Sequence, residues 1–256
     1  MNDFVAHGFL SGDSAPWMKD FDNDFQDWIG LYHEVNDEGM KMLLVAKQDG
    51  SSNQKILANQ LAVRILTNYQ AVYHLAKLGL ESETRAIMRG LLEAVFVLQA
   101  TEKKLGFSER FVKHSLNEHK KFLKDLADLS LLDGPSTKDF DALGKFDQSE
   151  HLSVWKIADQ AEMGEFYKMQ YARLCMHTHP SALGLTDTLK VNDQGIPTGT
   201  IFLHSYIDTD HNLMTAIGFM LCAIGSINRL FALNRLERIR ELLEAHVKLG
   251  DKMQRQ

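Results

Sequence analysis

The chain has 256 residues, of which 45% are hydrophobic and 24% are charged, so it can bury a sizeable core without cross-links. Its formal net charge of −6 excludes a surface that binds nucleic acid over its whole extent, although one local basic site is compatible with it. Cys175 and Cys222 are the only cysteines, which excludes a disulfide framework and fits a reducing compartment. The amino-terminal residues do not show the pattern of a secretory signal, so we expect a cytoplasmic protein.

The first half of the chain is expected to form an irregular arm followed by four helices. The arm covers residues 1–20, with Trp17 as a candidate anchor. Apolar residues then recur at three- and four-residue steps, which is the spacing of one face of a helix. This spacing predicts helices at about 21–47, 52–79, 82–101 and 108–129. Gly79 fits the position just after a helix end, and the short connection that follows predicts antiparallel neighbours.

The middle of the chain contains a break and then a fifth helix. Residues 130–153 are the best candidate for an internal loop, with room for one short helix. A helix is expected from about Ser153 to His177. It should end before Pro180, because proline disfavours a helical conformation in the residue that precedes it.

The last third begins with a change of pattern. Alternating apolar and polar residues on either side of a turn at 192–195 predict a small β-hairpin within 187–204. Helical spacing returns at about 210–233, with Thr209 or Asp210 as the N-cap, and it can continue to 249.

One stretch of this region requires a comparison with membrane spans. From Asn212 to Asn228 the chain carries no charge over 17 residues, which is at the short end of the range for a spanning helix. Because the stretch also contains Asn, Thr, Ser and two Gly, a buried core helix is favoured over a membrane span. We therefore expect a single all-α domain over 1–256, a multi-helix bundle with a β-hairpin insertion and no membrane contact.

The helix at 82–101 carries charged residues among apolar side chains that point in every direction. Arg85, Arg89 and Glu93 follow one another at four-residue steps, so they form one row. Charges in such surroundings need partners, because an isolated buried ion is strongly unfavourable. The row is either an internal network that fixes helix packing or the floor of a polar cleft, and the sequence leaves both interpretations open.

A second polar group lies at the end of the fifth helix, between Tyr171 and Ser181. If the helix persists, Arg173 and His177 share a face, and His179 falls at the helix end. Histidine can transfer protons near neutral pH and arginine can hold a phosphate, so this pair suits phosphoryl chemistry on RNA. The alternative is that histidine merely caps the helix.

Metal and nucleotide chemistry find less support in the sequence. His177, His179, His204 and His211 fall close together in the chain, but no HExxH motif is present and the first two point to different helix faces. The sequence also lacks a P-loop, a strand-linked GxGxxG and a GxSxG motif. We therefore expect neither a metal site nor a cofactor.

Two runs of the chain resemble a family of uncharacterised bacterial helical proteins. They are Gly79–Leu98, which contains the R-x-x-x-E row, and Tyr171–Gly184, which contains a Tyr/Ser/His-Pro helix end. More loosely, the chain is similar to the HEPN superfamily of up-and-down helical bundles. Many of those proteins are metal-independent ribonucleases of toxin and phage-defence systems, with an arginine a few residues before a histidine. Arg173 and His179 match this motif with five residues between them, whereas Leu174 stands where many such motifs have a polar residue.

The resemblance implies an RNA-cleaving effector in which the ribose 2′-hydroxyl attacks its own phosphate. His177 or His179 would be the general base or acid, and Arg173 would bind the phosphate. Arg89 and Glu93 would orient this set from the neighbouring helix.

Further substrate contacts are expected from Tyr171, Arg85 and Ser181. The HEPN resemblance also implies a homodimer that pairs two motifs, and the toxin interpretation implies a neutralising partner protein. The rival hypothesis is a non-catalytic helical binding or scaffold protein, in which both polar groups only hold the bundle together.

Overall fold

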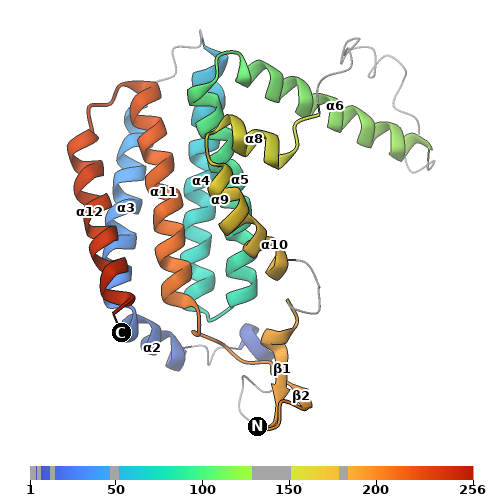
Figure 1. The fold of residues 1–256 in the computed structure, drawn as a ribbon, viewed down its shortest axis with the longest axis vertical. Coiled ribbons are helices and arrows are strands. Elements are labelled where there is room, and N and C mark those ends of the chain that lie inside the picture. The colour runs from blue at the N-terminus through green and yellow to red at the C-terminus, as the bar shows by residue number, and fades with distance from the viewer. Residues whose placement is uncertain are drawn as a thin grey trace.

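Helices form most of the chain, as the periodicity of the sequence predicts. The computed structural model describes residues 4, 7–11, 15–46, 52–128, 151–178 and 184–255. Over this part of the chain the protein is an all-α bundle with a two-stranded antiparallel hairpin near one end (Figure 1). The predicted fold class is therefore confirmed.

The described part of the chain contains helices, short helical turns and two strands. In chain order they are η1 (Gly8–Leu10), α2 (Ala15–Asp24), α3 (Gln26–Val45), α4 (Asn53–Lys77), α5 (Glu81–Lys103), α6 (Phe107–Asp128), α8 (Val154–Gln160), α9 (Gly164–Phe166), the π-helical turn η3 (Tyr167–Tyr171), α10 (Ala172–Thr178), η4 (Thr186–Thr188), β1 (Leu189–Val191), β2 (Pro197–Thr200), α11 (Thr209–Phe231) and α12 (Leu236–Met253).

The core lies between the long helices α3, α4, α5, α11 and α12. Helix α11 packs against the other four, and α4 packs against α5. The facing sides carry apolar side chains that are completely buried, among them Val35, Ile65, Leu91, Phe96 and Ile217. Burying each such side chain favours folding by about 1.5–3 kcal/mol, so these contacts dominate the stability of the bundle.

Helix α11 has the position of a core helix. By length and composition α11 could cross a membrane, but 56% of its apolar 18-residue stretch is buried inside the protein. Its neighbours α3, α4, α5 and α12 cover it from several sides. This placement agrees with the core-helix interpretation of the uncharged stretch at 212–228.

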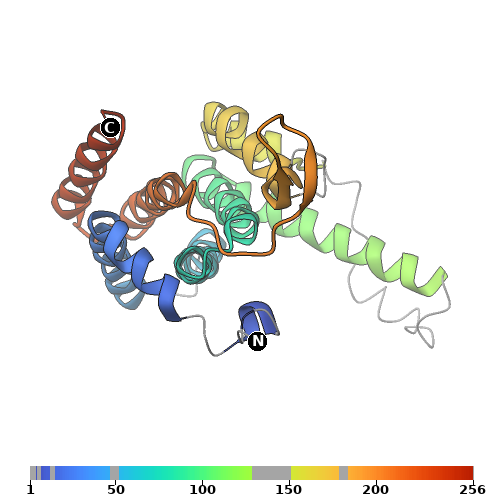
Figure 2. The same ribbon diagram turned by 90° about the horizontal axis from the view of Figure 1, so that it is seen from below.

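The remaining helices lie outside this bundle. Helix α6 extends away from it on the side opposite α12 (Figures 1 and 2). Helices α8 and α10 pack against α5. The α5 helix is therefore covered on one side by the bundle and on another by the chain from α8 to α10.

The segment that leads into α11 is attached to the turn between α4 and α5. The Ser205 backbone N–H donates a hydrogen bond of 2.9 Å to the Gly79 carbonyl. The Tyr206 hydroxyl lies 2.8 Å from the Lys77 carbonyl oxygen and 3.0 Å from that of Trp17. The segment is thus fixed both to the bundle and to the amino-terminal helix α2.

The amino-terminal part of the chain differs from the expected arm and single helix. Helix α2 begins at Ala15, so residues 15–20 of the arm expected at 1–20 are helical. Pro16 stands in the first turn of α2, where a missing N–H breaks no helical hydrogen bond. The helix expected at 21–47 is divided at Phe25 into α2 and α3.

Left-handed residues also interrupt the later helical stretches. The helix expected from Ser153 to His177 is interrupted over Ala161–Met163, where Glu162 has a positive φ of 59°. The stretch expected at 210–233 ends close to its predicted end, at Phe231, and Ala232 with a φ of 50° separates it from its possible continuation, which forms α12. A left-handed residue ends a helix because its backbone cannot continue the right-handed turn.

The two expected insertions have different outcomes. The hairpin predicted at 187–204 is present, with Leu189 opposite Thr200 and a turn in which the Asn192 side chain accepts from two backbone N–H groups. The loop expected at 130–153 lies outside the described residues except for 151–153, which precede α8 without regular structure.

Candidate functional site

Polar side chains from three segments meet on the face of α5 that α10 covers. Helix α5 contributes four of them at successive four-residue steps, which places them in one row. The chain around α10 and the residue before α11 contribute the others. The contacts form two groups: the Asp208 cluster (Glu81, Arg85, Arg173, His177 and Asp208) and the Tyr171 cluster (Arg89, Glu93 and Tyr171).

Arg85 is the buried centre of the Asp208 cluster, with 3% of its side chain exposed. Its Nη2 donates to Glu81 Oε2 at 3.2 Å and to Asp208 Oδ2 at 2.6 Å. Glu81 Oε1 in turn accepts from the Asp208 backbone N–H at 2.7 Å. A buried guanidinium needs such partners, so these contacts fix the segment before α11 onto α5.

The contact between Arg85 and His177 determines which ring nitrogen of His177 carries the proton. Arg85 Nη1 lies 3.3 Å from His177 Nδ1. A guanidinium has donors only, so Nδ1 must accept this hydrogen bond and the proton of the neutral ring lies on Nε2. In this state His177 presents an N–H donor at Nε2.

Arg173 is more loosely held than Arg85. Its Nη2 lies 3.4 Å from Asp208 Oδ2, and the exposed fractions of the two side chains are 33% and 37%. A partly exposed ion pair of this kind contributes only about 0–1 kcal/mol to stability. Arg173 is therefore the cation of the cluster that an incoming anion can recruit most easily.

His211 lies beside this cluster on the first turn of α11. Burial, together with the nearby Arg173 cation, lowers the pKa of His211 below its ordinary value. Its Nε2 atom is buried and has no hydrogen-bond partner within the described part of the chain. His211 is therefore neutral near pH 7 and adds no positive charge to the site.

The Tyr171 cluster lies one helical turn further along α5. Tyr171 donates to Glu93 Oε1 at 2.8 Å, while Arg89 donates to the same carboxylate oxygen at 3.1 Å and to the Tyr171 hydroxyl at 3.2 Å. Burial and then the Glu93 carboxylate raise the pKa of Tyr171, so its hydroxyl stays protonated. Tyr171 closes a π-helical turn, a feature that is frequent at functional sites.

The structure brings the two polar groups of the sequence together. The predicted row on α5 contacts Tyr171 and His177, which belong to the second group. Of the predicted row only Arg85 is buried, because the Arg89 and Glu93 side chains are 25% and 36% exposed. His179 and Ser181 lie outside the described residues.

Glu81 and Asp208 are the members of the cluster that the sequence did not single out. Glu81 stands one turn before Arg85, so the i+4 spacing carried a signal for it. For Asp208 the sequence offered only a weak indication, its position beside the start of a predicted helix. We expected Thr209 or Asp210 to cap the helix, but the N-cap is Asp208, and its side chain makes no capping bond. Its carboxylate accepts from arginines instead.

The histidines considered as metal ligands do not come together in the described structure. His204 stacks on Trp17, with the ring centroids 4.7 Å apart. Within the described residues, His177, His204 and His211 belong to no group of three candidate ligands that could share an ion.

A family model covers the part of the chain that carries most of this site. The model of a family of unknown function (DUF5677) matches residues 55–196, which include both runs on which the resemblance was based. Asp208 lies beyond the matched region. No curated protein and no solved structure matches the chain.

Proposed function

The chain belongs to DUF5677, a family of unknown function, and we propose that it is a metal-independent RNA-cleaving effector of the toxin or phage-defence type. The observation that carries the proposal is the pairing of two different arginines around His177 and Asp208. Arg85 is buried and holds the geometry, whereas Arg173 is partly exposed and only loosely paired.

Phosphate binding follows from this division of roles. A phosphodiester that approaches α10 can replace the long contact between Arg173 and Asp208, because a charge-assisted bond to phosphate is stronger than a partly exposed ion pair. Asp208 keeps its short contact with Arg85, so the loss of Arg173 leaves no carboxylate without a partner. Nε2–H of His177 can donate to a second phosphate oxygen.

The reaction that suits these groups is internal transesterification of RNA. A general base removes the 2′-hydroxyl proton, the 2′-oxygen forms a bond to phosphorus, and the bond from phosphorus to the 5′-oxygen breaks. The 5′-oxygen takes a proton, which gives a 2′,3′-cyclic phosphate and a 5′-hydroxyl end. Arg173 and His177 stabilise the charge that develops on the phosphate, and His179 keeps its predicted role as general base or acid.

The neighbouring residues act as a support. Tyr171 and the pair of Arg89 and Glu93 fix the start of α10 against α5, which orients Arg173 and His177. The proposal also includes a cytoplasmic location, which fits the low cysteine content. A homodimer that pairs two such sites follows from the HEPN resemblance, and a neutralising partner protein follows from the toxin interpretation.

The test is RNA cleavage by the purified protein in the presence of EDTA. We expect fragments with 2′,3′-cyclic phosphate and 5′-hydroxyl ends, identified by mass spectrometry, and no cleavage at a 2′-deoxy position. Arg173→Ala and His177→Ala should each reduce the rate by about 10²–10⁴-fold, the range for losing a proton-transfer or charge-stabilising group.

Lys168→Ala is the matched control for these variants. Lys168 is a cation on the same helical segment, but its Nζ lies over the Trp155 ring, 5.7 Å from the centroid. Its removal should leave the rate unchanged. The proposal fails if the wild type cleaves no RNA, if EDTA abolishes cleavage, or if Arg173→Ala and His177→Ala cleave at the wild-type rate.

A non-catalytic scaffold is the second candidate, and the near-complete burial of Arg85 favours it. Under that alternative, Arg173 and His177 only complete the network around Arg85 and Asp208. The wild type would then cleave no RNA, and both alanine variants would have a lower melting temperature than the wild type. Under the enzyme proposal the wild type cleaves RNA and both variants stay folded, with a nearly unchanged melting temperature for Arg173→Ala, whose lost contact with Asp208 is a long one.

A further inference from the structure

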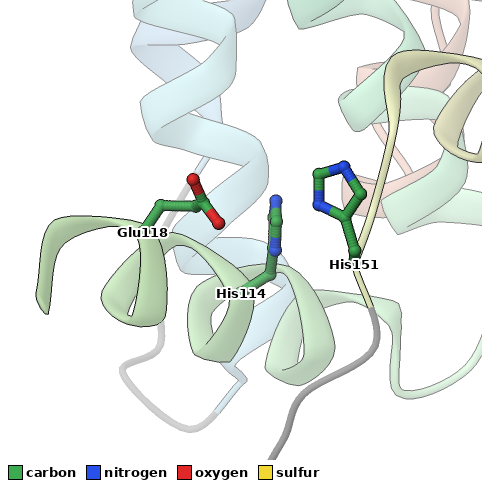
Figure 3. A group of neighbouring side chains, drawn as sticks. All are labelled: His114, Glu118 and His151. Atoms are coloured by element: carbon green, nitrogen blue, oxygen red, sulfur yellow. The ribbon is translucent and has the colours of Figure 1, made fainter. Parts of the chain in front are cut away.

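Three residues that can bind a metal ion lie together on α6 and beside it, outside the site described above. They are His114, Glu118 and His151, and their candidate ligand atoms all lie within 4.8 Å of one another. Figure 3 shows the His114 ring between the Glu118 carboxylate and the His151 ring, with all three side chains directed into the same space.

The fold determines how these residues come together. His114 and Glu118 are four positions apart on α6, so they occupy one face of the helix. His151 comes from the residues just before α8, where the neighbouring Leu152 is only 4% exposed and Ser153 caps the helix. The backbone on the carboxyl side of His151 is therefore anchored, and its ring faces His114 with the centroids 5.5 Å apart.

The ligand set favours a particular class of ion. Two imidazoles and one carboxylate suit Zn²⁺ and similar transition ions, whereas Ca²⁺ and Mg²⁺ prefer oxygen ligands alone. Two imidazoles that share a tetrahedral zinc ion have ring centres roughly 5 Å apart, which is close to the separation observed here.

We propose that His114, Glu118 and His151 bind one Zn²⁺ ion, with water in the fourth position. Ligand atoms around zinc lie roughly 3.3 Å apart, so the side chains must close by about an ångström or more. Side-chain rotation can contribute this closure, because His114 is partly exposed and the other two residues are exposed. The bound ion links α6 to the start of α8, two segments of distant sequence. This proposal is independent of RNA cleavage.

The experiment is a titration of the chelator-treated, full-length protein with Co²⁺, followed by displacement with Zn²⁺. We expect one Co²⁺ per chain, with the visible absorption of a four-coordinate ion, and loss of that absorption when Zn²⁺ is added. His114→Ala and His151→Ala should each weaken binding by at least about 10–100-fold, since even the loss of an outer-shell partner has that effect. Glu118→Gln should weaken binding as well, because it removes the negative charge.

His119→Ala is the matched control, because His119 is an exposed histidine on the same helix and lies outside the cluster. It should bind Co²⁺ as tightly as the wild type. Circular dichroism confirms that each variant keeps its helices. The proposal is overturned if the wild type shows no saturable absorption that Zn²⁺ displaces, or if His114→Ala and His151→Ala bind as tightly as His119→Ala.

Discussion

Asp208 accepts hydrogen bonds from two arginines at unequal distances, 2.6 Å from Arg85 and 3.4 Å from Arg173. The short bond belongs to a buried guanidinium that has to be neutralised, and the long bond belongs to a partly exposed one. A single carboxylate therefore neutralises a buried arginine and also holds the arginine that we propose to bind phosphate. Its structural role can be measured separately from any activity.

Replacing Asp208 should destabilise the protein because it removes a principal acceptor from buried Arg85. We expect Asp208→Ala to lower the free energy of unfolding by about 1–3 kcal/mol, the penalty for leaving a buried donor without its acceptor. Asp210→Ala is the control, because the Asp210 carboxylate accepts from the His211 backbone N–H and lies outside the Asp208 cluster. Urea denaturation gives both values. Equal losses in the two variants would contradict the role assigned to Asp208.

The candidate site was partly predictable at this scale. The spacing of Arg85, Arg89 and Glu93 follows from helix geometry alone, so the row was visible in the sequence. The position of Asp208 beside this row could not be predicted, because it depends on how the segment after the hairpin packs against the turn between α4 and α5. Local spacing carries no information about such a long-range contact.

At the scale of elements, the predicted helices agree well with α4, α5 and α6, whose ends lie within about two residues of the expected ones. The prediction was weaker where a helix is interrupted without glycine or proline. Glu162 and Ala232 adopt left-handed conformations, and neither residue type signals a break. Between Ser153 and His177 the apolar residues on both sides of the break kept the helical spacing, so periodicity alone predicted one continuous helix.

Gly79 provides a test of how strictly the turn between α4 and α5 is specified. Its φ is +71°, and an added Cβ would lie 2.6 Å from the Cβ of His204. Gly79→Ala should therefore destabilise the protein by about 1–3 kcal/mol, because the backbone is strained and the segment at His204 must move away from the new Cβ. Thermal or urea unfolding measures the change.

Gly30→Ala is the matched control for this substitution. Gly30 lies inside α3, and an added Cβ would meet no atom within 4 Å. Because alanine is favoured over glycine inside a helix, this variant should be stabilised by about 0.5–1 kcal/mol. Similar effects of the two substitutions would show that the turn has no special requirement for glycine.

At the scale of the whole molecule, stability should depend on pH through histidines that are neutral in the folded state. Burial lowers the pKa of both His204 and His211 below the ordinary value. In the unfolded chain a histidine titrates near pH 6.5, so below about that pH the unfolded state binds more protons than the folded state. The free energy of unfolding should therefore decrease as the pH falls from about 7.5 to 5.5.

Melting temperatures measured across this range test the prediction. His211→Asn should reduce the slope, because one of the responsible groups is gone, whereas His119→Asn on the exposed face of α6 should leave it unchanged. Carboxylates titrate near pH 4 and contribute mainly below this window. A stability that stays constant or rises as the pH falls to 5.5 would contradict the assignment.

The hydrogen bonds of Tyr206 connect the beginning of the chain to its candidate site. The Tyr206 hydroxyl reaches the carbonyl groups of Trp17 and Lys77, and Tyr206 precedes Asp208 by two residues. Shortening the chain near Trp17, or fusing another chain there, would therefore disturb the segment that carries Asp208, although Asp208 is distant from Trp17 in the sequence.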